Sequence, residues 1–146
     1  MHGCGPQPAA GIKCMLKLEI VTPERRVVDE TVDSVTVPTL SGEAGILPNH
    51  APLVSALKPG ILSFSNKGTT ERLAVAGGFV EVSSDMVSVL TDLAESASEI
   101  NIDTVRAERD AAEKALAANA SSAIEETETY RDQLDFANAK LQLAGR

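Results

Sequence analysis

The stretch MLKLEIV, residues 15–21, sets the fold class because its apolar and charged residues alternate one by one. Leu16, Leu18 and Ile20 fall on one side of an extended chain, and the charged residues between them fall on the other. A period of two is typical of a β-strand with one buried face. The stretch therefore predicts a strand whose aliphatic side chains enter a core.

Further stretches of the same kind follow between residues 26 and 92: RVVDETV, DSVTVP, GILSFS, ERLAVA, GFVEV and MVSVLTD. Turn signals separate them, namely Pro23, NKG at 66–68, the Gly77–Gly78 pair and SSD at 83–85. No helical period lies between these strands. Short strands at this spacing favour an antiparallel β-sandwich or barrel, to which we assign residues 15–98.

The composition changes near residue 95. Beyond it the chain has no proline and a single glycine, Gly145, while strong helix formers dominate. Asp103 can cap or charge-stabilise a first helix, and SAIE at 122–125 forms a capping box for a second. The second helix has an apolar stripe at spacings of three, four and multiples thereof: Ile124, Tyr130, Leu134, Ala137, Leu141 and Ala144.

Residues 99–146 are therefore predicted to form a helical hairpin joined at ANASS, residues 118–122. One long helix interrupted there is the alternative, since neither glycine nor proline enforces a break. Its alanine-rich faces bury little area, so the hairpin needs a partner surface.

Composition excludes several classes of function. The 146 residues suffice for one domain with an appendage, and the net charge of −8 opposes binding to a nucleic acid. Neither a membrane span nor a signal peptide is present, so we expect a cytoplasmic chain.

Residues 1–14 are predicted to be a disordered leader. His2, Cys4 and Cys14 lack a CxxC and a fourth ligand, so no metal site is expected.

SGEAGILPNHAPLVSALKPG, residues 41–60, sets prolines and glycines around His50, with Glu43 nearby. Ser41 and Ser55 complete the residue types of a Ser–His–acid hydrolase, although no GxSxG elbow is present. Fixed φ at the prolines and permissive glycines instead predict a stiff docking loop. The alternative function is a small β-sandwich ligand-binding domain or hydrolase that uses His50.

GEAGILPNHAPLVSALKPG, followed by AVAGGFVEV and a charged, alanine-rich tail, resembles the epsilon subunit of bacterial F-type ATP synthase, called delta in mitochondria. The resemblance runs from Met15 to the C-terminus. It implies a β-sandwich of two antiparallel sheets, about ten strands in all, followed by a C-terminal α-helical hairpin.

The same resemblance implies a non-catalytic central-stalk subunit that links the gamma subunit to the c-ring and couples proton flow to ATP synthesis. Glu43 matches a residue facing the c-ring, and His50 matches a residue at the gamma contact. Such a subunit lies peripherally on the cytoplasmic face of the bacterial inner membrane. Its helices reach the alpha and beta subunits transiently and restrain hydrolysis.

IDTVRA, residues 102–107, fits the nucleotide motif of this family, which implies that Ile102, Asp103, Arg106 and Ala107 contact ATP. Glu113, Asn138 and Gly145 stand where ATP-binding members carry arginines. We therefore expect weak ATP binding at most and no required cofactor. Candidates for inhibitory contacts to the beta subunit are four further basic residues of the hairpin: Arg109, Lys114, Arg131 and Lys140.

Overall fold

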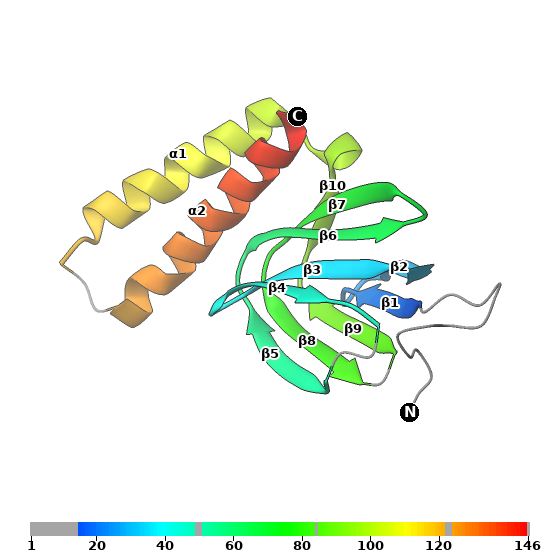
Figure 1. Ribbon diagram of the computed structural model, residues 1–146. Helices are drawn as coiled ribbons and strands as arrows, with labels where there is room; N and C mark the ends of the chain where they lie inside the picture. Colours follow the sequence, from blue (N-terminus) through cyan, green and yellow to red (C-terminus); the bar gives the residue numbers. More distant parts are fainter. Residues whose placement is uncertain (1–14, 49–50, 84, 122–123, 146) are drawn as a thin grey trace, which may run out of the picture.

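The computed structural model describes residues 15–48, 51–83, 85–121 and 124–145. Ten strands form two layers, and a pair of helices lies against one of them (Figure 1). The first layer contains β4 (Gly42–Ile46), β3 (Ser34–Thr39), β6 (Gly60–Asn66), β7 (Thr69–Val75) and β10 (Ala94–Ser96). The second contains β5 (Leu53–Leu57), β8 (Gly78–Ser83), β9 (Met86–Thr91), β1 (Leu16–Val21) and β2 (Arg26–Val32). The predicted sandwich of about ten strands is confirmed.

The two layers are hydrogen-bonded to each other through β3. The first residues of this strand pair with β6, and its last residue, Thr39, pairs with Leu57 of β5. All strand pairs in the described residues are antiparallel except β1 with β9. A parallel pair needs a long crossover connection, which the seven intervening strands supply here.

The core between the layers is aliphatic, as the alternation predicted. Leu16, Leu18 and Ile20 have no exposed surface. The other fully buried large side chains come from both layers: Val32, Val35, Val37, Ile46, Leu62, Val75, Val80, Val82 and Val87. Burial of each such side chain stabilises the fold by roughly 1.5–3 kcal/mol.

The predicted loop at residues 41–60 is not a continuous loop, because β4 and β5 lie within it. β4 is an edge strand that pairs with β3 and buries only Ile46, so its sequence shows no alternation. The alternation of apolar and polar residues also did not predict β10, which has only three residues. Of the loop's three glycines, only Gly42 uses a positive φ, of 119°.

A short 3₁₀ helix, η1 (Ala97–Glu99), leads into α1 (Ile102–Ala118), and α2 (Ile124–Ala144) returns beside it. The predicted helical hairpin is therefore confirmed, and the alternative of one long interrupted helix is wrong. The cap of α1 is Asn101, whose Oδ1 accepts from the Thr104 amide at 3.1 Å, and Asp103 lies in the first turn. The capping box predicted at Ser122 lies outside the described residues.

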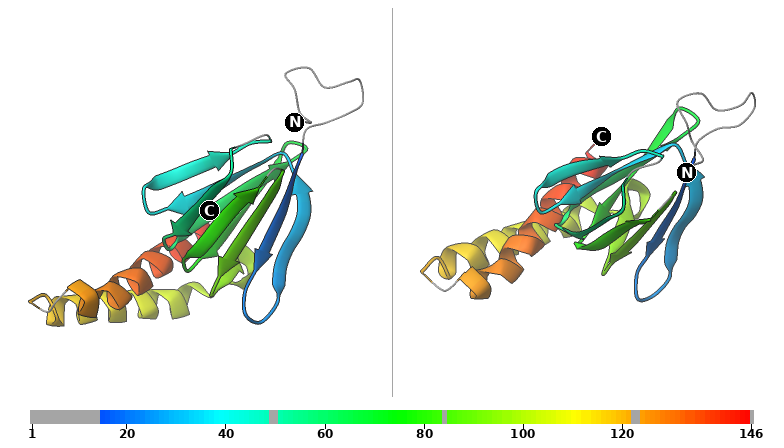
Figure 2. Two further views of the ribbon diagram at one scale, coloured as in Figure 1. Left: turned by 90° about the horizontal axis from the view of Figure 1, so that it is seen from below. Right: turned by 60° about the horizontal axis from the view of Figure 1, so that its bottom comes forward.

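α2 docks on the outer face of β6 and β7, and the helix ends near the interhelical connection project beyond the sandwich (Figure 2). The docked cluster contains Ala74 of β7 with Phe136, Ala139 and Leu143 of α2. The predicted stripe missed these three α2 residues, although it included the buried Ala137. α2 contacts both α1 and the sheet, so its buried surface is wider than one stripe.

Glu99 ties the start of the helical region to the sandwich. Its carboxylate accepts from the Ser96 amide at 2.9 Å and pairs with Arg25 of the β1–β2 turn at 3.2 Å. The Ser96 amide, and to a smaller extent Arg25, hold the pKa of Glu99 below its usual value. The division of the chain into a sandwich domain at residues 15–98 and a hairpin domain at residues 99–146 stays a prediction.

Gly78 provides the first testable position. Its φ is 138°, and a Cβ there would overlap the main-chain carbonyl of Leu90 on β9. Gly78→Ala is therefore expected to lower the free energy of unfolding by at least about 3 kcal/mol, measured by urea denaturation. Gly45→Ala is the matched control, because its Cβ meets no atom within 4 Å. Equal urea midpoints for the two variants would contradict this close approach.

Asp132 on α2 predicts a pH dependence. Desolvation, followed by the charges of Glu128 and Asp135, raises the pKa of Asp132. Its contribution to stability is thus present below the ordinary value of 3.8 and is lost as pH rises through the higher folded-state pKa.

Asp132→Asn should therefore stabilise the protein at pH 7, by roughly 0.2–0.5 kcal/mol for each repulsive pair removed. Thermal unfolding at pH 7 and pH 3 measures this gain. Asp103→Asn should instead destabilise the protein at pH 7, because an ionised acid in the first turn of α1 interacts favourably with the helix dipole. Loss of stability in Asp132→Asn at pH 7 would refute the repulsion.

Candidate functional site: two outer faces and the helix pair

Glu43 is exposed on the edge strand β4, opposite Pro38 of β3. The turn that precedes it is fixed by Thr39, whose hydroxyl donates to the Gly42 carbonyl oxygen at 2.6 Å. Leu40, in the same turn, is 71% exposed. No hydrogen bond or ion pair joins the Glu43 side chain to another residue in the part of the chain that the structure describes. The turn thus presents a free carboxylate beside an apolar side chain.

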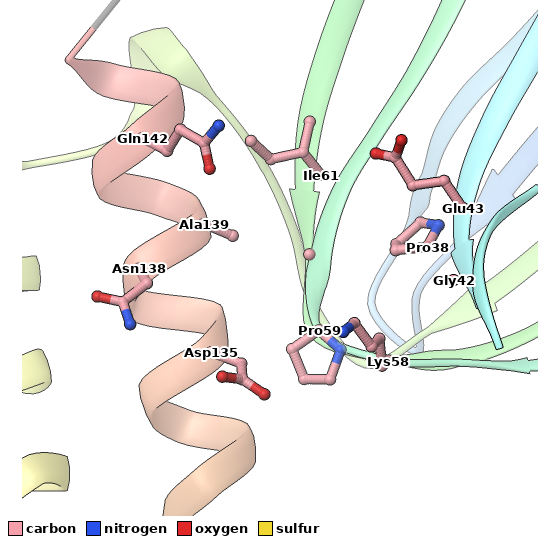
Figure 3. Close-up of a pocket in the computed structure, with 11 residues that line it drawn as sticks. Pro38, Gly42, Glu43, Lys58, Pro59, Ile61, Asp135, Asn138, Ala139 and Gln142 are labelled. Carbon is pink, nitrogen blue, oxygen red and sulfur yellow. The ribbon is translucent and has the colours of Figure 1, made fainter. Parts of the chain in front are cut away.

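One side of Glu43 faces the helix pair across a hollow of about 370 Å³ between β4, the β5–β6 turn and α2. Figure 3 shows Glu43 and Asp135 of α2 reaching into this hollow from opposite walls, with Lys58 near its base. A second hollow, of about 330 Å³, joins Glu43 to Arg72 and Gln142. Glu43 therefore lies at the boundary between the sandwich and α2.

His50, the other residue singled out in this stretch, lies outside the described residues. Of the side chains considered with it, Ser41 is exposed, whereas the Ser55 hydroxyl is half-buried and donates to the Ala56 carbonyl oxygen at 3.2 Å. The Ser55 hydroxyl is thus engaged with the main chain of its own strand.

An exposed apolar row crosses the outer face of the second layer. Strand register aligns Ala56 with Phe79, Phe79 with Leu90, and Leu90 with Val21 across four strands. Phe79 is 60% exposed and Leu90 57% exposed, and Val54 on the same face of β5 is 71% exposed. We call these five residues the apolar row.

A hollow of about 390 Å³ opens beside the apolar row, between Phe79, Leu90 and the β1–β2 turn. The helix pair packs against the other layer, so no element of the described chain covers the row. Sequence reasoning missed it, although a signal was available. Phe79 and Leu90 stand at positions where the alternation of their strands calls for polar residues.

The four candidate nucleotide contacts lie in the first two turns of α1. Ile102, Asp103, Arg106 and Ala107 are all exposed, and Val105 between them is buried. No ion pair engages Arg106 within the described ranges. None of the four lines the hollow of about 460 Å³ between the helices. Arg106 is therefore free to bind an anion, whereas Arg109, the cation three residues further along α1, is paired with Asp110.

The basic residues of the hairpin differ in their surroundings. Lys114 and Arg131 are exposed, and Arg109 pairs with the adjacent Asp110 at 3.3 Å. Only 8% of the Lys140 side chain is exposed. Lys140 is therefore a structural cation in this arrangement and is not available on the surface.

Lys140 is held by groups from three elements. Its Nζ lies 3.1 Å from Oε1 of Glu108 on α1 and 3.5 Å from Oε2 of Glu95 on β10. The same nitrogen lies 4.5 Å from the centre of the Phe136 ring. Of its two acidic partners, the Glu95 side chain is 29% exposed and the Glu108 side chain is 53% exposed, so water screens the pair with Glu108 more than the pair with Glu95.

Neither a metal site nor a membrane span is found in the described ranges. No group of three or more His, Cys, Asp or Glu residues there could hold a metal ion. The candidates His2, Cys4 and Cys14 lie outside these ranges. No helix of the described chain is both long and apolar enough to cross a bilayer.

Comparison with known proteins identifies the family. The family model of the ATP synthase delta/epsilon chain, beta-sandwich domain, matches residues 15–97. An ATP synthase epsilon chain from Desulfitobacterium hafniense (strain Y51) is 38% identical over 126 residues, covering 86% of each chain. One from Nitratidesulfovibrio vulgaris (strain DP4) is 48% identical over 102 residues, covering 70% of this chain and 76% of that one.

The solved structures extend the likeness to the helices. A chain in the mitochondrial ATP synthase of Euglena gracilis, solved as an OSCP/F1/c-ring assembly, superposes with a TM-score of 0.74 at 25% identity. The match covers 98% of this chain and 91% of that one. Sandwich and helix pair are thus both shared, and the resemblance read from the sequence is confirmed. The chain belongs to the ATP synthase delta/epsilon chain family.

Proposed function

We propose that this chain is a non-catalytic rotor subunit of a proton-translocating F-type ATP synthase, linking the gamma subunit to the c-ring. The observation that carries the proposal is the uncovered apolar row, in a chain whose relatives are ATP synthase epsilon chains. A row of this kind marks a contact surface for another protein. As a link between shaft and ring, the subunit would couple proton flow to ATP synthesis and need no active site of its own.

The apolar row is the surface we assign to gamma. The resemblance implies that His50 lies at the gamma contact. In the sequence His50 stands three residues before the start of β5, which carries Val54 and Ala56. The proposed histidine contact and the row are therefore continuous along the chain. Phe79 and Leu90 would act as the buried anchors of this interface, because large apolar side chains at the centre of a contact dominate its affinity.

The turn at Gly42 and Glu43 is the surface we assign to the c-ring. Its carboxylate has no partner among the described residues, and Leu40 adds an exposed apolar contact. The Glu43 carboxylate could accept a hydrogen bond from a cationic or amide donor on a polar loop of the partner. The subunit would then lie peripherally on the cytoplasmic face of the bacterial inner membrane, without spanning it.

The helix pair supplies the transient contacts to the alpha and beta subunits, through which it restrains ATP hydrolysis. Of the four candidates for inhibitory contacts, Arg109, Lys114 and Arg131 have exposed surface and could meet acidic segments there. Lys140 would take part only if its ion pairs with Glu95 and Glu108 were broken.

ATP binds weakly or not at all in this proposal. Four phosphate charges need several cations, yet the charged residues at i−3 and i+3 from Arg106 are Asp103, an acid, and Arg109, which is paired with Asp110. Lys140 is already neutralised by two carboxylates. No cofactor is required.

The gamma contact is tested by Phe79→Asp in the full chain. The variant should weaken binding to gamma at least about 30-fold, in keeping with loss of roughly 2 kcal/mol at an interface anchor, measured by interferometry with gamma from the same host. Thr70→Asp, at an exposed site on β7 in the other layer, is the control and should bind like wild type. If Phe79→Asp binds gamma with wild-type affinity, the row is not the gamma surface.

The ATP prediction is tested by isothermal titration of the full chain. We expect no micromolar binding and no difference between wild type and Arg106→Ala. The double variant Glu113→Arg/Asn138→Arg, which supplies cations at two positions implied by the resemblance, should gain affinity. Micromolar binding by wild type that disappears in Arg106→Ala would overturn the prediction.

A further inference from the structure

We propose that Lys140 is an internal lock that holds the helix pair against the sandwich without any ligand. Its ammonium group bridges Glu108 of α1 and Glu95 of β10 from a position on α2. One cation thereby joins both helices to the sandwich. The proposal concerns the chain itself and does not depend on its partners.

The apolar contact between α2 and the sandwich is small, which is why the lock matters. Its buried cluster contains Ala74, Ala139, Phe136 and Leu143, and the partly buried Ile61, Ala76 and Ile100 pack against it. The hollows of about 370 and 330 Å³ beside Glu43 show that α2 leaves the sheet incompletely covered along its length. A cluster of this size, with alanines at three of its seven positions, gives limited hydrophobic stabilisation.

The charged contacts lie at the centre of this interface. Glu95 pairs in register with Ala74, the β7 residue onto which α2 docks. Phe136 belongs to both the apolar and the charged part of the interface, because its ring packs in the apolar cluster and also contacts the Lys140 ammonium group. Low exposure of Lys140 limits screening by water most in its pair with Glu95, which is 29% exposed, and less in its pair with Glu108, which is 53% exposed.

Lys140 is also the one basic residue of the described hairpin that pairs with an acid of another element. Arg109 pairs with its neighbour in sequence, and Arg106, Lys114 and Arg131 have no ion pair among the described residues. Reversing the charge at Lys140 would place three carboxylates together across α1, α2 and β10. The helix pair should then leave the sandwich.

The test measures the distance between spin labels at Ala118 of α1 and Thr70 of β7, both exposed, in a full chain carrying Cys4→Ser and Cys14→Ser. Lys140→Glu should raise the ratio of undocked to docked molecules at least about tenfold, which corresponds to about 1.4 kcal/mol. Lys114→Glu makes the same charge change at an exposed lysine of α1 and should leave the ratio unchanged.

Full charge reversal provides the rescue. The triple variant Lys140→Glu/Glu95→Lys/Glu108→Lys should restore the docked distance, because each contact regains an opposite charge. Glu95→Gln, at a side chain 29% exposed, is the milder second variant if Lys140→Glu fails to fold, and it should give a smaller rise in the undocked fraction. A wild-type distance distribution in every variant, or undocking in Lys114→Glu equal to that in Lys140→Glu, would overturn the proposal.

Discussion

Every other part of the molecule is arranged around the aliphatic core between two layers of strands. Such a core uses one face of each layer and leaves each layer with an outer face. The two outer faces differ in whether another element of the chain covers them. α2 covers the outer face of β6 and β7, whereas the outer face of β5, β8 and β9 carries the uncovered apolar row. The helix pair is thus an internal partner for one face. The other face remains for an external partner.

The fold was largely predictable because alternation is a local signal. Leu16, Leu18 and Ile20 identify their strand without knowledge of its neighbours, and the same holds for the strands rich in valine. β4 and β10 were missed because an edge strand or a three-residue strand buries too few side chains to leave a pattern. The parallel pairing of β1 with β9 depends on closure of the whole sandwich.

The site was less predictable than the fold for a related reason. Glu43 was identified from its motif, and its exposure on β4 agrees with a contact role that stays a prediction. The surroundings of Lys140 come from α1, α2 and β10, which lie far apart in the sequence, so no local pattern could show that this lysine is buried. The stripe on α2 failed for the same reason, because Phe136 and Leu143 point toward a sheet formed much earlier in the chain.

The single pairing of Thr39 with Leu57 has a mechanical consequence. In the proposed assembly, gamma holds β8 and β9 while the ring holds the turn between β3 and β4. Torque between them would then pass through the core, through this junction of β3 and β5, and through the short segments that join the layers, such as Asp33 between β2 and β3. Peptide hydrogen bonds and close-packed aliphatic side chains resist deformation strongly, so the sandwich would act as a stiff coupling.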